Sequence, residues 1–251
     1  YRASGNSKYK ELAQHFVDVR GEAPNYFMEE KAKRGWNVWG PTGNDAEDTD
    51  YTQSTLPVRQ QKDAVGHAVR AVYLYTAMAD LANETGDAGL KEACETLWKS
   101  ITHRRMYVTG GIGSNPGNEG FGTSYDLPND TAYCETCAQV ANAMWNQRMN
   151  LLFSESKYAD KMELTLYNSI ISCVNYDGDK FFYGNPMSSG GGKTRSSWFG
   201  TACCPPNLMR TVMNLGGYIY TQKGNEVTMN LYIANNATLN VGGKTVKLNL
   251  E

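Results

Sequence analysis

The sequence predicts a mainly helical domain that is followed by the opening strands of a β-domain. Apolar residues recur at helical spacing before about residue 220, and the spacing becomes that of strands after Gly224. Short connections alternate with three long irregular stretches, at residues 22–60, 107–135 and 175–203. This alternation indicates about six helices in antiparallel hairpin order. If the helices stand side by side, the long stretches rise at one end and build one site.

Apolar periodicity predicts three helices in the first half of the chain, at 9–17, 61–83 and 90–101. Gly21 follows the first as a stop signal. Gly66 and His67 fall inside the second, where a small residue leaves room either for a ligand near the imidazole or for close helix packing. Cys94 lies on the apolar face of the third, so we expect it to be buried and inert. An acidic run at 45–50 is most simply a solvated face.

The segment that precedes the next helix determines which polar side chains share a face. Thr136 and Gln139 have the spacing of a capping box, which predicts a helix beginning at Cys137. The residues just before it are then extended, and side chains alternate along an extended segment. Glu135 and Cys137 therefore point the same way. The cap thus favours a Glu-x-Cys pair over the Cys-x-x-Cys pair that Cys134 would complete.

Two further helices and three strands complete the chain. The expected helices are 158–171 and 206–220, and the expected strands are 227–233, 237–241 and 245–250. Glu163 lies near the apolar face of the first helix, as a helix-edge charge or a buried polar anchor. Pro206 suits a helix start, so Cys203 and Cys204 lie beside a helix N-terminus, where the dipole stabilises a thiolate.

Composition excludes several classes of protein. The 251 residues carry a net charge of −2 with scattered Lys and Arg, so we expect no nucleic-acid partner. No apolar run is long enough to cross a membrane. Six cysteines are too few for a disulfide scaffold in a chain of this length, so reduced thiols and a cytoplasmic, reducing setting are expected. The glycine-rich stretch 109–122 lacks a phosphate-loop pattern, which leaves a flexible loop that carries Glu119.

The cysteine clusters predict a zinc site. Zinc prefers four ligands and accepts thiolates and carboxylates. Such a set is supplied by Glu135, Cys137, Cys203 and Cys204. A bound cation deprotonates thiols and keeps a sulfur ready as a nucleophile, for which Glu119 is the natural acid/base partner. A nucleophile with an acid/base is the arrangement of a retaining glycosidase, here with sulfur in place of the second carboxylate.

Two other interpretations remain open at this point. The first is a closed structural zinc site in a non-catalytic carbohydrate-binding or scaffold protein, with Cys134 as a ligand in place of Glu135. The second is a thiol redox protein that uses Cys134 and Cys137, although the βαβ context of such proteins is missing. We also retain a homodimer as a hypothesis for the assembly state.

Four motifs carry a resemblance to a known family: DYTQ at 50–53, AVGHAVR at 64–70, YCETCA at 133–138 and CCPPN at 203–207. Together they resemble glycoside hydrolase family 127, the β-L-arabinofuranosidases. The resemblance implies an (α/α)6 barrel followed by β-sandwich domains. Residues 1–222 would be the later half of the barrel, and residues 223–251 the start of the sandwich. The chain is then expected to be a fragment, which agrees with an N-terminal Tyr1 that does not look like a natural start.

The resemblance also implies roles for individual residues. Cys203 matches the nucleophile, which forms an S-glycosyl intermediate, and Glu119 matches the general acid/base. The remaining implied positions are zinc ligands at Glu135, Cys137 and Cys204, with Cys203 completing the set, and sugar contacts at His67, Tyr183 and, less closely matched, Glu163. The implied substrate is terminal β-L-arabinofuranose on plant-derived glycans or hydroxyproline-rich glycoproteins, or a related pectic sugar.

Overall fold

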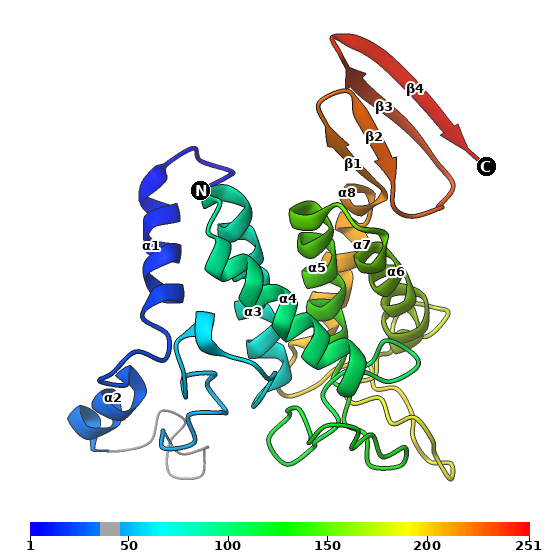
Figure 1. The fold of residues 1–251 in the computed structure, drawn as a ribbon. Helices are drawn as coiled ribbons and strands as arrows, with labels where there is room; N and C mark the ends of the chain where they lie inside the picture. The colour runs from blue at the N-terminus through cyan, green and yellow to red at the C-terminus, as the bar shows by residue number, and fades with distance from the viewer. Residues whose placement is uncertain (36–45) are drawn as a thin grey trace.

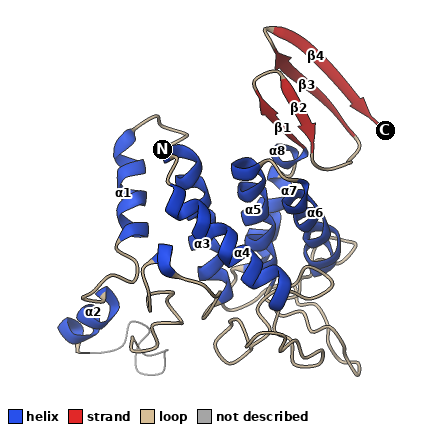
Figure 2. Cartoon of the chain, in the orientation of Figure 1, coloured by secondary structure: helices blue, strands red, loops and turns tan. Residues whose placement is uncertain are grey.

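The computed structural model describes residues 1–35 and 46–251 of the chain. Helices stand side by side, and the strands lie beyond one end of them (Figures 1 and 2). The helices are α1 (Ser7–Asp18), α2 (Tyr26–Arg34), η1 (Val58–Gln60), α3 (Ala68–Thr85), α4 (Ala88–Arg104), α5 (Thr136–Phe153), α6 (Ser156–Thr165), η2 (Leu166–Ile170), η3 (Ile171–Cys173), α7 (Cys204–Asn214) and α8 (Gly216–Ile219). The strands are β1 (Tyr220–Lys223), β2 (Glu226–Met229), β3 (Asn235–Val241) and β4 (Lys244–Leu250).

Helix α5 is the centre of the helical part. It packs against α3, α6 and α7, and every position from Thr136 to Trp145 except Met144 is buried. A helix that is covered on all sides needs partners for its polar side chains. Asn142 donates from Nδ2 to the carbonyl oxygen of Gly110 at 3.1 Å. The buried helix α5 therefore also anchors the long loop at 107–135 through a hydrogen bond.

The described parts of the long loops lie together at the end of the helices opposite the strands, as the hairpin order predicts (Figure 1). Backbone hydrogen bonds join them: Phe121 N donates to Gly66 O at 3.0 Å, and Thr136 N donates to Tyr183 O at 2.8 Å. Segments that are far apart in the sequence are thereby fixed against one another. This end of the molecule is where the predicted site residues should meet.

The strands form two antiparallel pairs. β1 pairs with β2, with Tyr220 opposite Met229, and β3 pairs with β4, with Asn235 opposite Leu250. The turn between β3 and β4 uses Gly242 and Gly243, whose φ values are +58° and +78°, as the sequence predicts for a tight hairpin. Within the described part of the chain, no helix is both long and apolar enough to cross a membrane.

Several predicted boundaries are wrong. The loop at 22–60 contains α2, which the sequence analysis did not predict, and part of the acidic run at 45–50 lies outside the described residues. The helix expected at 61–83 begins only at Ala68. The helix expected at 206–220 is divided into α7 and α8, and the strand β1 that follows them was not predicted. The strand expected at 227–233 stops at Met229.

The expected capping box of α5 is also absent, although the helix begins within one residue of the prediction. Glu135 is the N-cap and makes no side-chain capping bond. The Thr136 hydroxyl instead donates to the Phe182 carbonyl oxygen at 2.8 Å. Gln139 Oε1 accepts from the backbone N–H of Ile112 at 3.0 Å. Both side chains therefore bond to residues distant in sequence instead of forming the capping box.

Gly66 does not lie inside a helix, and the reason is a close backbone contact. Its φ is +69°, and a Cβ at this position would collide with the carbonyl oxygen of Asp50. The left-handed backbone turns the chain just before His67, which becomes the N-cap of α3. Gly66 therefore allows close packing, but against the backbone of a loop and not against another helix.

This contact yields a prediction on stability from a matched pair of glycines. Gly86 has nearly the same φ, +72°, but a Cβ there would meet nothing within 4 Å. Gly86→Ala should lower the free energy of unfolding by about 1–2 kcal/mol through backbone strain alone. Gly66→Ala should lower it by about 2–5 kcal/mol, because overpacking adds to the strain. Urea denaturation of both variants measures the difference, and equal losses would contradict the steric contact.

Candidate active site and metal centre

Two helix N-termini deliver the cysteine cluster. Cys203 is the N-cap of α7 and Cys204 is its first residue, followed by prolines in the first turn. Glu135 is the N-cap of α5 and Cys137 lies in its first turn. Because α5 and α7 pack against each other, the two N-termini meet. The sequence prediction that both cysteines of the CCPPN motif lie beside a helix N-terminus is confirmed.

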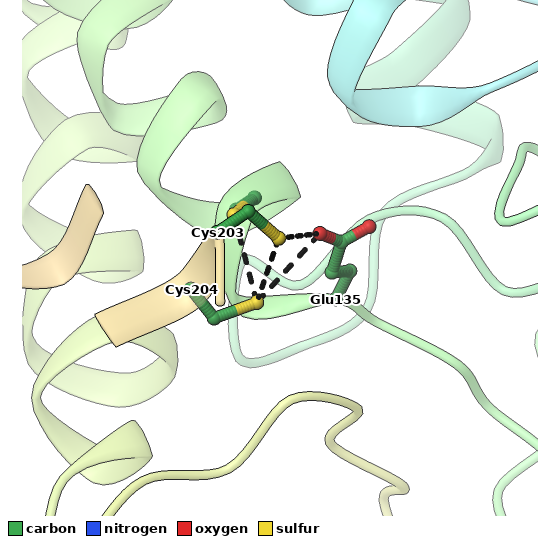
Figure 3. Close-up of side chains that lie close together, drawn as sticks. Glu135, Cys203 and Cys204 are labelled. Carbon is green, nitrogen blue, oxygen red and sulfur yellow. Dashed lines mark hydrogen bonds between the residues drawn. The ribbon is translucent and has the colours of Figure 1, made fainter. Parts of the chain in front are cut away.

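The four side chains form one compact group. Each of Glu135, Cys137, Cys203 and Cys204 offers a ligand atom, and these atoms all lie within 4.8 Å of one another. Glu135 Oε1 is 3.3 Å from Cys203 Sγ and 3.6 Å from Cys204 Sγ, and all three side chains converge in Figure 3. The Cys203 and Cys204 sulfurs are 3.7 Å apart, and the Cys137 and Cys204 sulfurs are 3.5 Å apart.

These distances fit a tetrahedral zinc ion. Zinc–sulfur bonds of about 2.3 Å in a tetrahedron place sulfurs roughly 3.8 Å apart, and a carboxylate oxygen roughly 3.5 Å from each sulfur. The observed separations of 3.3–3.7 Å agree with this geometry. Glu135 Oε2 is buried without a hydrogen-bond partner among the described residues. A buried carboxylate surrounded by thiols is the donor set that a divalent cation would satisfy.

The electrostatics of the group also favour a cation. Burial raises the pKa of Glu135, and burial raises the pKa of the Cys203 thiol to about 12. The pKa of Cys204 is raised by its hydrogen bond with Cys137 and by burial. Both cysteines lie beside the N-terminus of α7, where the helix dipole favours a thiolate, whereas burial favours the neutral thiol. A bound cation would supply the missing positive charge and release the protons.

Cys137 behaves differently from its neighbours. Its pKa is lowered, first by the hydrogen bond with Cys204 and also by one from the Asn207 side chain, although burial opposes both. Asn207 Nδ2 lies 3.0 Å from Cys137 Sγ. The sulfurs of this group are thus held by different donors. The sequence analysis assigned no role to Asn207, although its position four residues after Cys203 on a helix places both on one face.

Glu119 lies beside this group and is held by two other side chains. The Tyr133 hydroxyl donates to Glu119 Oε1 at 2.7 Å, and His67 Nε2 is 3.1 Å from Glu119 Oε2. His67 Nδ1 accepts from the backbone N–H of Arg70, so the proton of the neutral imidazole is on Nε2 and points at Glu119. Carboxylate oxygens of Glu119 and Glu135 and a ring nitrogen of His67 lie within 4.8 Å of one another.

Backbone hydrogen bonds tie the loop that carries Glu119 to itself and to the start of α3. Backbone bonds join Gly120 to Asn115 in both directions at 3.0 Å, and Ala68 N donates to Glu119 O at 3.1 Å. Glu119 itself has a φ of +53°, which is uncommon for a residue with a side chain. A strained residue held by surrounding contacts is typical of functional positions. Tyr133 was not among the predicted site residues, although it lies two residues before Glu135 in the same segment.

Two predicted sugar contacts lie at the cluster, and one does not. His67 contacts Glu119 as described, and the Tyr183 hydroxyl lies 3.0 Å from Cys203 Sγ. The pKa of Tyr183 is raised by burial, so it stays a hydrogen-bond donor. Glu163 is half-buried and lines a separate cavity that residues of β1 and β2, including Thr221 and Thr228, also line. The structure does not bring Glu163 into the group around Cys203.

Cys134 is not part of the metal-binding group. It is fully buried beside Tyr107 and Ala132, and its backbone φ is +40°. The pKa of its thiol is raised to about 12 by burial. Glu135 and Cys137 lie together in one group, as the Glu-x-Cys pair predicts, and Cys134 lies outside that group. Cys94 is buried and unbonded, as predicted.

The amino-acid sequence matches a known family of glycosidases over most of its length. Residues 1–217 match the family model described as the β-L-arabinofuranosidase GH127 catalytic domain. The chain belongs to glycoside hydrolase family 127. A non-reducing end β-L-arabinofuranosidase from Bifidobacterium longum subsp. longum is 39% identical over 261 residues, which include 98% of this chain and 39% of that protein.

Solved structures support the same family and fold. A GH127 β-L-arabinofuranosidase from Geobacillus stearothermophilus T6 is 46% identical with a TM-score of 0.93, over 99% of this chain and 40% of that one. A structure described as a GH127 β-arabinofuranosidase is 43% identical with a TM-score of 0.86, over 99% of this chain and 36% of that one. The chain therefore spans about two fifths of the length of these relatives.

The contact between His67 and Glu119 predicts a change in titration. Burial and the nearby Arg70 charge lower the pKa of His67, whereas Glu119 opposes them by stabilising the imidazolium. Glu119→Gln removes that stabilisation, so the pKa of His67 should fall further. NMR of the imidazole signals against pH measures it. Glu163→Gln, at the separate cavity, is the matched control and should leave the titration of His67 unchanged. An unchanged or raised pKa in Glu119→Gln would refute the pairing.

Proposed function

We propose that this chain carries the catalytic centre of a retaining glycoside hydrolase that releases terminal β-L-arabinofuranose from the non-reducing end of plant-derived glycans. The observation that carries the proposal is the position of the Glu119 carboxyl group beside Glu135, which also contacts Cys203. This shared neighbour supports Glu119 as the acid/base and Cys203 as the sulfur nucleophile. The substrate class follows the names of the relatives from Bifidobacterium and Geobacillus.

The metal centre would be held by Glu135, Cys137, Cys203 and Cys204. When bound, zinc supplies the positive charge that keeps the cysteines deprotonated at neutral pH and stabilises them in a buried site. Cys203 is the half-exposed member of the group, whereas Cys137 and Cys204 have exposed fractions of 1% and 0%. Access therefore favours Cys203 as the sulfur that reaches a sugar.

The reaction proceeds in two displacements in this proposal. The Cys203 sulfur attacks the anomeric carbon while the bond from that carbon to the leaving oxygen breaks, and Glu119 gives its proton to this oxygen. Glu119 then takes a proton from water, whose oxygen attacks the same carbon as the carbon–sulfur bond breaks. Two inversions give net retention of configuration. The thiolate of Cys203 and the proton on Glu119 are both restored.

The residues around Cys203 and Glu119 orient the reacting groups. Tyr133 and His67 hold the two oxygens of the Glu119 carboxyl group separately, so the carboxyl plane is fixed. The Tyr183 hydroxyl, next to the Cys203 sulfur, is placed to contact sugar hydroxyls, as is His67. In the whole protein, we propose that the helices of residues 1–222 form part of an (α/α)6 barrel and that residues 223–251 open a β-sandwich.

One prediction of the proposed function concerns catalysis by Cys203 and Glu119. In the full-length protein, Cys203→Ala and Glu119→Gln should each lower kcat/KM on p-nitrophenyl β-L-arabinofuranoside by at least about 10³-fold, because each removes a group that changes bonds in the transition state. Cys134→Ser is the matched control, since its thiol lies outside the group, and it should keep near-native turnover. Native turnover in Cys203→Ala would exclude the proposed nucleophile.

Another prediction of the proposed function concerns the zinc content of the protein. The purified protein should contain one zinc ion per chain, and Glu135→Gln or Cys204→Ser should lower the zinc content measured by atomic emission, because each removes one of four ligands. Cys134→Ser should retain the ion. If Cys134→Ser instead loses zinc while Glu135→Gln retains it, the site is the closed structural one and the scaffold interpretation replaces the enzymatic one.

A further inference from the structure

Asn207 connects the two helices that supply the cysteine cluster. It lies one turn after Cys203 on α7, and its backbone N–H donates to the Cys203 carbonyl oxygen at 3.2 Å. Its side-chain Nδ2 reaches across to α5 and donates to Cys137 Sγ at 3.0 Å. One residue of α7 therefore fixes the position of a sulfur that belongs to α5.

The orientation of this amide is set by two groups on its other side. Asn207 Oδ1 accepts from Arg210 Nη2 at 3.0 Å and from the Tyr73 hydroxyl at 3.2 Å. Arg210 Nη2 also donates to the Tyr73 oxygen at 2.8 Å, which leaves the phenol proton for Asn207. A guanidinium has donors and no acceptor, so it can face the amide oxygen and not the amide nitrogen. The N–H group must then face the sulfur.

The sulfurs of the group thus differ in what holds them. Cys137 is buried and receives the amide N–H of Asn207, whereas Cys203 is half-exposed and lies next to the Tyr183 hydroxyl. A hydrogen bond to a metal-bound sulfur fixes its direction and stabilises its lone pairs. A sulfur held in this way would stay on a bound metal ion, whereas Cys203, without such an amide donor, would be free to bond elsewhere.

We propose that Asn207, oriented by Arg210 and Tyr73, is a positioning residue that holds the Cys137 sulfur on zinc while Cys203 reacts. This inference rests on the zinc site of the proposed function. It adds three residues, from α3 and α7, that the chemistry of the four ligands does not include. Its effect is expected on how firmly the metal is held, and therefore can be measured without substrate.

The main test measures zinc affinity in the full-length protein. Asn207→Leu keeps the approximate size of the side chain and removes both of its hydrogen-bonding groups. Competition with a chromogenic chelator should show zinc bound 10–100-fold more weakly, roughly the range for loss of a partner to a metal ligand. Asn214→Leu is the matched control on the same helix, because the Asn214 side chain donates to the Arg210 carbonyl oxygen and contacts no cysteine. It should bind zinc as the unchanged protein does.

A second measurement separates positioning from general damage to α7. With cobalt(II) in place of zinc, the sulfur-to-metal charge-transfer band should move to longer wavelength in Asn207→Leu, because a sulfur without its N–H donor has higher-energy lone pairs. Arg210→Met, a change at an exposed residue, should weaken zinc binding in the same direction, since the amide can then turn its oxygen towards sulfur. Arg210→Lys keeps a donor and should lie closer to the unchanged protein.

The outcomes distinguish this inference from the proposed function. Absence of zinc from the unchanged protein would overturn the metal site and the inference together. Zinc in the unchanged protein, with equal affinity and an unmoved cobalt band in Asn207→Leu, would overturn the inference alone. Equal weakening in Asn214→Leu would also overturn it, because the effect would then be one of helix stability. If Asn207→Leu does not fold, native zinc affinity in Arg210→Met decides against the inference.

Discussion

The burial of Glu135 among three cysteine side chains is the constraint on which the rest of this structure depends. Its exposed fraction is 3%, and one of its oxygens has no partner among the described residues. A carboxylate in such a place costs several kcal/mol unless a positive charge or hydrogen bonds compensate for it. The thiols donate too weakly to do so fully. A bound cation would compensate for this burial, and without one the raised pKa of Glu135 favours the neutral carboxyl group.

The rest of the fold can be understood as the means of bringing these atoms together. Helix α5 is buried on nearly every side, so its N-terminus has a fixed place in the molecule. Packing of α7 against α5 then brings the adjacent cysteines to Glu135. The loop around Glu119 is tied by backbone bonds to the turn at Gly66 and to the start of α3. Residues more than 130 positions apart are thus held within a few ångströms, as with Tyr73 and Asn207.

Periodicity and local chemistry predicted part of this arrangement. Apolar spacing predicted α4 and α6, whose apolar residues are largely buried, and also α1, although its Leu12 and Phe16 are exposed. Pro206 predicted α7 as a helix start, and the alternation of side chains before a helix predicted the Glu-x-Cys pair. The capping box was wrong because Thr136 and Gln139 have tertiary partners. The predicted start of α3 was wrong because Gly66 adopts a left-handed backbone that packs against Asp50. Tyr133 and Asn207 escaped notice because their roles depend on partners distant in sequence.

The two hydrogen bonds to Glu119 have a consequence for the position of its carboxyl group. Each oxygen of the carboxyl group is tied to a different segment, one through Tyr133 and one through His67, and the backbone of Glu119 is bonded to α3. A group fixed from three directions does not have to be recruited by closure of a lid. In the proposed mechanism, the same carboxyl group would therefore occupy one place in both displacements.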